Sequence, residues 1–223
     1  MKKDVATLIT ETRFWQLIEE SHGGRNLEAV LGRCPVEELM GFRYWWEYFG
    51  RLSYRQDLWA VAYVVLGGCN DDGFDNFRFW LMARGRDIFY AALENADSLC
   101  DVFGRLSNPS GSEYPQQEEL DYAVMNVLEE VYGKDFDEEA ARYEWPADVL
   151  PHLDFQWEED DEESIHRVCP RTFDRWWGDD IPKNVEWASQ NMLVLGIIVI
   201  LGLALHFMNF WYKMQFAEII GNP

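Results

Sequence analysis

Residues 57–81 read DLWAVAYVVLGGCNDDGFDNFRFWL, and this stretch predicts two helices joined by a glycine turn. Its first ten residues are almost entirely apolar, and Gly67-Gly68 follows them, as glycines commonly do where a helix ends. After the turn, Phe74, Phe77 and Trp80 recur every three residues, which is the spacing of one buried helix face. The stretch therefore predicts an all-α fold.

The same helical period continues on both sides of this pair. Apolar residues at intervals of three and four predict further helices, and no period-two run is long enough to indicate a strand. The expected helices cover residues 12–22, 26–31, 35–49, 57–66, 72–84, 87–96 and 118–132. The residues NPSGSEYP at 108–115 are typical of a loop. We therefore expect a compact multi-helix soluble domain over residues 1–150.

Acidic side chains are concentrated in one third of the chain. The 223 residues carry 40 Asp and Glu against 19 Lys and Arg, a net charge of −21 that argues against nucleic acid as a partner. Residues 113–163 hold 19 of these acids and two basic residues. The acids peak in one unbroken run, Glu158, Glu159, Asp160, Asp161, Glu162 and Glu163. The run is typical of a solvated linker or helix face, here within residues 151–190, and its alternative interpretation is a docking surface for a basic protein partner.

A second distinctive segment is the apolar run at residues 192–211, MLVLGIIVILGLALHFMNFW, which contains no formal charge. A helix of twenty residues covers about 30 Å, the thickness of a bilayer core. We expect one transmembrane helix over residues 191–212, a short tail over 213–223, and the amino-terminal domain in the cytoplasm. Gly202, His206 and Asn209 share one helix face and predict a seam between copies in a homo-oligomer. The alternative is that His206 and Asn209 reach the membrane interface.

The segment around the paired glycines is also the best candidate for a chemical site. Asp71, Asp72 and Asp75 crowd the expected start of a helix, and Arg78 follows, with Arg84 and Arg86 beyond it. These groups would suit hydrolysis or nucleotide binding, whereas the structural interpretation is a loop with Asp72 as helix cap and Asp–Arg ion pairs. Cys69 has no histidine near it in sequence to activate it. The spacing of Cys and His residues predicts no metal site, and nothing indicates a cofactor.

Five short motifs, taken in order, resemble one family. They are FWxLI at 14–18, DLWAxAY at 57–63, LGGCNDDGF at 66–74, FRxWL at 77–81 and GR at 85–86. Their order and spacing resemble the bacterial family catalogued as domain of unknown function forty-two-forty, over roughly residues 12–177. Asn70 stands where the family pattern leads us to expect Ser. The resemblance implies a helical fold and a bacterial source, hence the inner (cytoplasmic) membrane as location, but it transfers no catalytic residue.

These observations favour a membrane-tethered, non-enzymatic protein-interaction module with an acidic cytoplasmic face, for example in bacterial immunity or defence. Two alternatives stay open. The first is a membrane effector whose spans oligomerise after the helical domain senses a ligand. The second is a hydrolase or nucleotide-binding enzyme that uses the loop over residues 67–75. The absence of a recognisable catalytic motif favours a role without catalysis.

Overall fold

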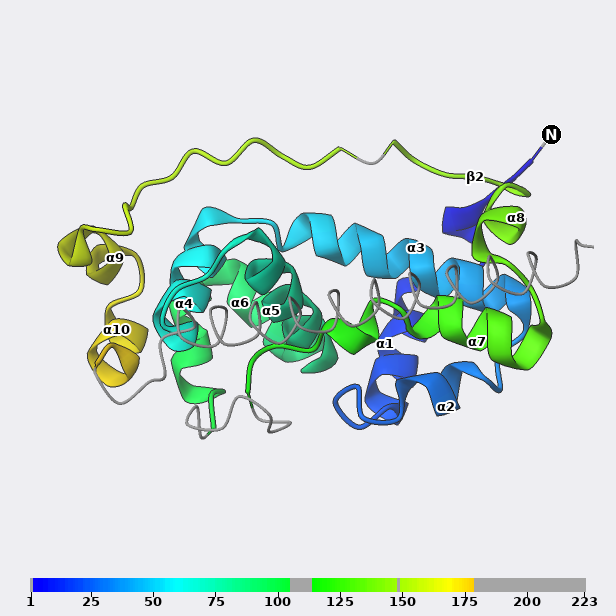
Figure 1. Ribbon diagram of the computed structural model, residues 1–223, viewed down its shortest axis with the longest axis horizontal. Helices are drawn as coiled ribbons and strands as arrows, with labels where there is room; N and C mark the ends of the chain where they lie inside the picture. Colours follow the sequence, from blue (N-terminus) through cyan, green and yellow to red (C-terminus); the bar gives the residue numbers. More distant parts are fainter. Residues whose placement is uncertain (1, 105–113, 148, 179–223) are drawn as a thin grey trace, which may run out of the picture. The chain divides into compact units, whose positions relative to one another are not determined.

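The computed structural model describes residues 2–104, 114–147 and 149–178, which all belong to one compact unit (Figure 1). Its α-helices are α1 Glu11–Glu20, α2 Leu27–Leu31, α3 Val36–Leu52, α4 Gln56–Leu66, α5 Asp71–Ala83, α6 Arg86–Glu94, α7 Ala123–Tyr132, α8 Phe136–Ala140, α9 Glu162–Val168 and α10 Pro170–Trp176. Short 3-10 helices lie at η1 Val5–Thr7, η2 Ala96–Asp101 and η3 Glu118–Leu120. Strands β1 Lys3–Asp4 and β2 Tyr143–Glu144 form one short parallel pair. The predicted all-α class is confirmed.

The turn between α4 and α5 shows how local sequence ends one helix and begins the next. Gly67 follows α4 in the left-handed conformation, with φ +67°, which glycine adopts without steric cost. The amide oxygen of Asn70 then accepts a hydrogen bond from the Gly73 backbone N–H at 2.9 Å. Asn70 is therefore the cap of α5, and the expectation that Asp72 caps this helix is wrong. Asn and Asp are about equally favourable as helix caps. Asp71 and Asp72, which follow Asn70 in the first turn, are exposed to solvent.

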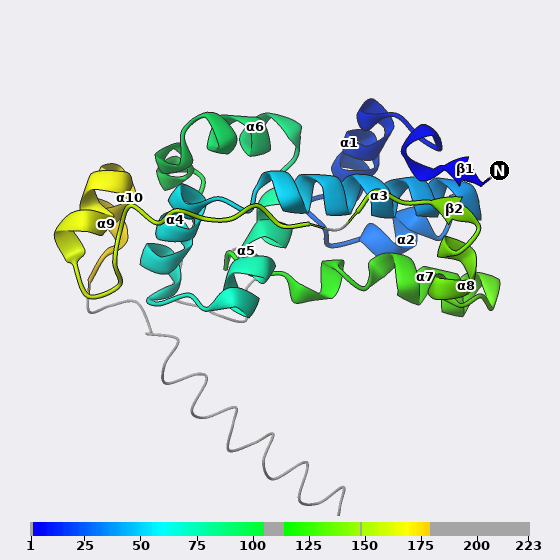
Figure 2. The same ribbon diagram turned by 90° about the horizontal axis from the view of Figure 1, so that it is seen from above.

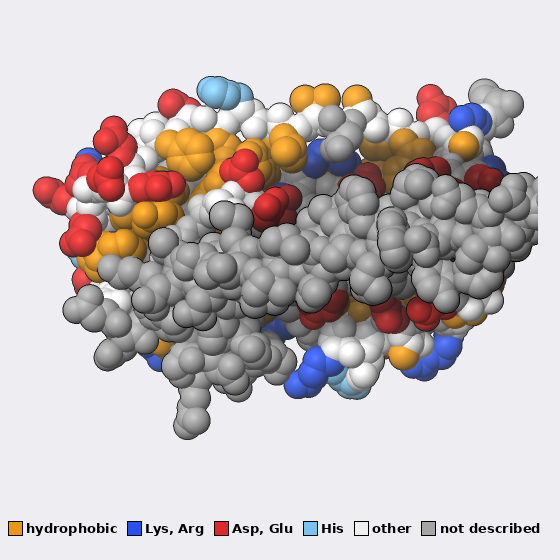
Figure 3. All heavy atoms as spheres, in the orientation of Figure 1, with side chains coloured by type: hydrophobic (Ala, Val, Ile, Leu, Met, Phe, Trp, Pro, Cys, Tyr) orange, Lys and Arg blue, Asp and Glu red, His pale blue; other side chains and the backbone are white. Residues whose placement is uncertain are grey.

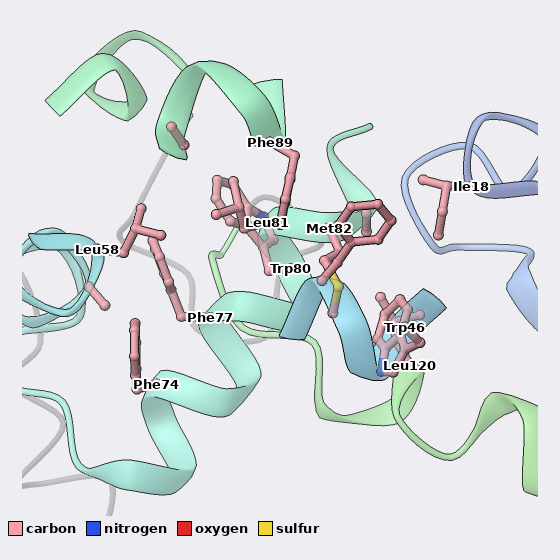
Figure 4. Close-up of a cluster of buried hydrophobic side chains, with 14 of the residues drawn as sticks. Ile18, Trp46, Leu58, Phe74, Phe77, Trp80, Leu81, Met82, Phe89 and Leu120 are labelled. Carbon is pink, nitrogen blue, oxygen red and sulfur yellow. The ribbon is translucent and has the colours of Figure 1, made fainter. Parts of the chain in front are cut away.

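Helix α5 lies at the centre of the hydrophobic core. Phe74, Phe77, Trp80 and Leu81 are almost completely buried, as their spacing predicts. Figure 4 shows side chains from α1, α3, α4, α6 and η3 around those of α5. Burying each of these large side chains stabilises the fold by roughly 1.5–3 kcal/mol. The core therefore depends on helices contributed by the whole segment from α1 to η3.

The chain after β2 differs most from expectation. Residues 151–190 were expected to form an acidic linker, yet the described part contains α9 and α10, and α10 packs against both α4 and η2. The side chains of two tryptophans form hydrogen bonds along the extended chain that connects β2 to α9 (Figures 1 and 2). The indole of Trp145 donates to the Ala140 carbonyl at 2.9 Å, and that of Trp157 donates to the Gln56 carbonyl at 2.8 Å.

The predicted membrane helix over residues 191–212 and the tail over 213–223 lie outside the described residues. Within the described ranges, no helix combines the length and the apolar character needed to cross a membrane. The predicted helix over 118–132 is divided in two, because η3 and α7 are separated by a turn at Asp121 and Tyr122.

Candidate functional site

The acidic run begins a helix. Asp161 is the cap of α9, and its carboxylate accepts a hydrogen bond from the Ser164 backbone N–H at 3.2 Å. The buried Ser164 hydroxyl accepts from the Glu158 N–H at 3.0 Å and donates to the Asp161 carbonyl at 2.7 Å. All six carboxylates from Glu158 to Glu163 are exposed. Negative charge is favourable at a helix amino-terminus, so α9 presents the run to solvent in an ordered turn.

A buried carboxylate from a distant part of the chain holds these two helices in place. Asp97 in η2 is 5% exposed and accepts hydrogen bonds from the first turn of α10. Its oxygens bind the Arg171 N–H at 2.9 Å, the Thr172 N–H at 2.8 Å and the Thr172 hydroxyl at 2.8 Å. This contact spans 74 residues or more, and it docks the α9–α10 unit on the core.

The structure brings the acidic run close to the glycine turn. The pKa of the Tyr63 hydroxyl is raised by burial and by the nearby charges of Glu159 and Asp160. The pKa of the Cys69 thiol is raised by burial and by Asp75, Asp71 and Glu159. Trp157, which directly precedes the run, also packs on Tyr63 with ring centroids 5.4 Å apart. The run and the carboxylates that follow the glycine turn therefore lie near one another, and we call them together the acidic face. It consists of Asp71, Asp72, Asp75 and Glu158–Glu163.

Aromatic side chains lie within this face. Phe155 is 44% exposed, and its ring meets Trp59 edge to face at 5.4 Å. Trp59 in turn stacks on Phe74 at 4.5 Å, and its indole donates to the Cys69 carbonyl at 2.9 Å. Acidic and hydrophobic side chains gather together over α9 and its surroundings in Figure 3. An exposed aromatic ring that packs on other aromatic side chains and lies three residues before a run of exposed carboxylates is suited to a partner that is both basic and apolar.

The carboxylates of the acidic run lack counter-charges within the part of the chain that the structure describes. No described Lys, Arg or His forms an ion pair with any residue of Glu158–Glu163. Among the same described residues, no group of three or more Asp, Glu, His or Cys is placed to hold a metal ion. The negative potential of this surface is therefore available to a partner.

Arg78 is placed for structure. Its side chain is 6% exposed, donates to the Gly50 carbonyl and to Asp75, and lies over the rings of Tyr54 at 5.1 Å and Phe74 at 5.3 Å. The guanidinium is consequently turned into the core, while Asp71 and Asp72 face solvent. Cys69 is buried, and its raised pKa keeps the thiol protonated. Among the described residues, Cys69 and Arg78 therefore offer neither a reactive nucleophile nor an exposed cation to Asp71, Asp72 and Asp75.

The other predicted residues lie elsewhere. Arg84 and Arg86 stand apart from Arg78, at the turn between α5 and α6. The predicted seam residues Gly202, His206 and Asn209 lie outside the described residues. Residue-by-residue reading of the sequence missed Phe155 and Asp97, although an aromatic side chain three residues before an acidic run is a signal that could have indicated Phe155.

Comparison with known proteins identifies the family. The model of the family described as "Protein of unknown function (DUF4240)" matches residues 9–130. Neither the curated proteins nor the solved structures give a match. The matched segment extends from just before α1 almost to the end of α7, and so it includes the glycine turn and ends before the acidic run. The chain belongs to the DUF4240 family.

Proposed function

We propose that this protein is a non-enzymatic interaction module whose acidic face binds a basic protein segment. The observation that carries the proposal is the exposed ring of Phe155 beside six exposed carboxylates without described counter-ions. Complementary charge accelerates encounter and selects the partner, and a buried aromatic anchor supplies much of the affinity. The partner should therefore carry several Lys or Arg side chains around an apolar one.

The rigid base of the face supports the same proposal. The α9–α10 unit is docked through Asp97, and Trp157 fastens the preceding chain to α4. A surface that is already ordered loses little conformational entropy when it binds. The apolar run at residues 192–211 would hold such a module at the bacterial inner membrane, and we retain this tether as part of the proposal.

The test uses the full-length chain. It is first crosslinked to its neighbours in host membranes and lysate, and the crosslinked products are then captured in a non-ionic detergent. The face variant combines Glu158→Gln, Glu159→Gln and Asp160→Asn. A matched control removes the same amount of charge from exposed residues elsewhere, by Glu119→Gln, Glu129→Gln and Glu130→Gln. Partners captured by the wild type are identified by mass spectrometry, and each is then titrated against the purified variants.

We expect a captured protein with a basic segment that the control variant binds normally. The face variant and Phe155→Ala should each weaken that binding by about tenfold or more. Raising the salt concentration from about 50 mM to about 300 mM should weaken binding to the wild type more than binding to the face variant. If every captured protein binds the face variant as well as it binds the wild type, the acidic face is not the interface and the proposal fails.

A further inference from the structure

A groove separate from the acidic face lies between α1 and the turn that joins α5 to α6. It consists of two adjoining hollows with volumes of about 530 Å³ and 310 Å³. Both hollows are lined by Glu19, Arg84, Gly85 and Ile88. Ligand sites commonly have volumes of about 300–1,000 Å³, so the groove is large enough for a small organic molecule.

Arg84 is a cation without an acidic partner in this groove. Its guanidinium donates to the Gly23 carbonyl at 2.9 Å and to the Gln117 amide oxygen at 3.1 Å, and its Nε donates to the Trp80 carbonyl at 3.3 Å. All three acceptors are neutral, and no carboxylate among the described residues pairs with Arg84. A half-buried charge without a counter-ion is costly, which makes an anion a favourable occupant.

Two further arginines increase the positive charge near Arg84. Burial lowers the pKa of Arg84, and the neighbouring charge of Arg25 lowers it further. Arg86 lines the larger hollow with a side chain that is 57% exposed, and it forms long ion pairs with Glu11 at 3.7 Å and with Asp87 at 3.8 Å, so an anion would have to compete with these two carboxylates for it. Like charges that repel each other gain most from an anion carrying more than one negative charge.

The backbone around the groove is shaped for this arrangement. His22, Gly23 and Gly24 have consecutive positive φ angles of 53°, 77° and 86°, and left-handed backbone at a non-glycine residue such as His22 is uncommon. A Cβ atom on Gly23 would lie 3.2 Å from the Arg84 guanidinium, so the absence of a side chain there lets Arg84 approach the carbonyl. The loop thus holds the guanidinium at the groove through the Gly23 carbonyl, together with the side chain of Gln117.

Part of the remaining wall is apolar, although Thr12, Gln16 and Asp87 also line the larger hollow. Trp15 lines the larger hollow, Ile18 lines the smaller one, and Ile88 is common to both. An apolar wall favours a ligand that has a flat or hydrocarbon body in addition to its charged group. Glu19 lines both hollows and Asp87 lines the larger one, and the charges of these two carboxylates should oppose anion binding.

We infer that this groove binds a small organic phosphate, with the phosphate at Arg84 and Arg86 and the organic body against Trp15 and Ile88. Arginine recognises phosphate oxygens through its fixed fork of N–H donors, which makes a phosphate monoester a suitable dianion. The inference is independent of the acidic face, because it uses other residues and a ligand of opposite charge.

The test is isothermal titration calorimetry of the full-length chain in non-ionic detergent with 1-naphthyl phosphate. Inorganic phosphate, neutral 1-naphthol and micellar phosphatidic acid are titrated as comparison ligands. Three variants are compared. Arg86→Gln removes a cation, Glu19→Gln removes an opposing anion, and Gln16→Trp fills the groove. Arg33→Gln is the control, because Arg33 is an exposed arginine outside the groove whose Nε also donates to a helix carbonyl.

We expect 1-naphthyl phosphate to bind the wild type with a Kd below about 1 mM, and to bind more tightly than phosphate or naphthol. Arg86→Gln should weaken binding about fivefold or more, Gln16→Trp should abolish it, and Glu19→Gln should tighten it. Arg33→Gln should leave it unchanged. The same pattern obtained with phosphatidic acid alone would support the site and assign the phosphate to a lipid. Absence of binding to every phosphate ligand, or equal binding by Arg86→Gln, Gln16→Trp and the wild type, would overturn the inference.

Discussion

The contact between Asp97 and the first turn of α10 permits a quantitative prediction. Replacing Asp97 by Ala removes three hydrogen bonds to one buried carboxylate and leaves the backbone N–H groups of Arg171 and Thr172 without acceptors. A hydrogen bond to a charged group contributes about 1.5–3 kcal/mol, but losses at one site are not additive. We therefore expect Asp97→Ala to reduce the free energy of unfolding by about 4 kcal/mol, comparable to the removal of a strong helix cap together with the cost of leaving buried N–H groups without acceptors.

The conservative change Asp97→Asn should cost less, about 1–2 kcal/mol, because the amide oxygen can still accept from Thr172 while its NH₂ group faces the Arg171 N–H. For a domain of this size, the loss of about 4 kcal/mol expected for Asp97→Ala corresponds to a fall in Tm of about 8–16 °C. Urea unfolding followed by circular dichroism measures the free energy, and hydrogen exchange of the α10 amides reports whether α10 detaches first.

The control for this prediction is Asp101→Asn. Asp101 belongs to the same short helix and also pairs with Arg171, but its side chain is 65% exposed. An exposed ion pair contributes little to stability, so this variant should unfold like the wild type. The reasoning is refuted if Asp97→Ala and Asp101→Asn have the same stability, or if Asp97→Ala leaves α10 fully protected from exchange.

Three further predictions concern stability. Gly24→Ala should cost about 2–3 kcal/mol in urea unfolding, because Gly24 has φ +86° and a Cβ atom there would lie 2.8 Å from the Leu120 side chain. Left-handed backbone at a non-glycine residue by itself costs about 1 kcal/mol, so a measured cost of Gly24→Ala below about 0.5 kcal/mol would contradict this prediction. Arg78→Ala should cost about 2–4 kcal/mol in the free energy of unfolding, whereas Asp72→Asn should leave stability unchanged, since Arg78 is buried and Asp72 is exposed. Equal effects of the two changes on stability would refute the structural role of Arg78. Burial raises the pKa of Cys169 to about 12, so its contribution to stability should be fully present below about pH 9 and fall above it by about 1.4 kcal/mol per pH unit, a slope that Cys169→Ala should reduce.

The helices and much of the core follow from local pattern. The spacing of Phe74, Phe77 and Trp80 predicts a helix with one buried face, and α5 has that face buried. Gly67 marks the end of α4, because a left-handed residue is readily supplied by glycine. The exposure of Glu158–Glu163 is likewise expected, since like charges that repel each other remain in water.

The error over the cap of α5 has a local cause as well. Asn70, Asp71 and Asp72 are all residue types that cap helices, and composition alone does not choose among neighbours. In the structure, Asn70 has extended backbone, with ψ near 180°, and so its side chain reaches the Gly73 N–H. The choice depends on where the preceding turn leaves the chain, which the paired glycines determine.

The sequence alone was sufficient for properties that depend on neighbouring residues: the helical class, the turn at Gly67, the concentration of acid before α9 and the membership suggested by short motifs. The tertiary structure was needed for every contact between distant segments. Asp97 meets Thr172, Glu159 approaches Tyr63, and Arg84 reaches the Gly23 carbonyl, over 75, 96 and 61 residues. Periodicity and propensity act over a few residues, whereas such contacts depend on how whole helices pack, and that packing is what places the acidic face and the arginine groove.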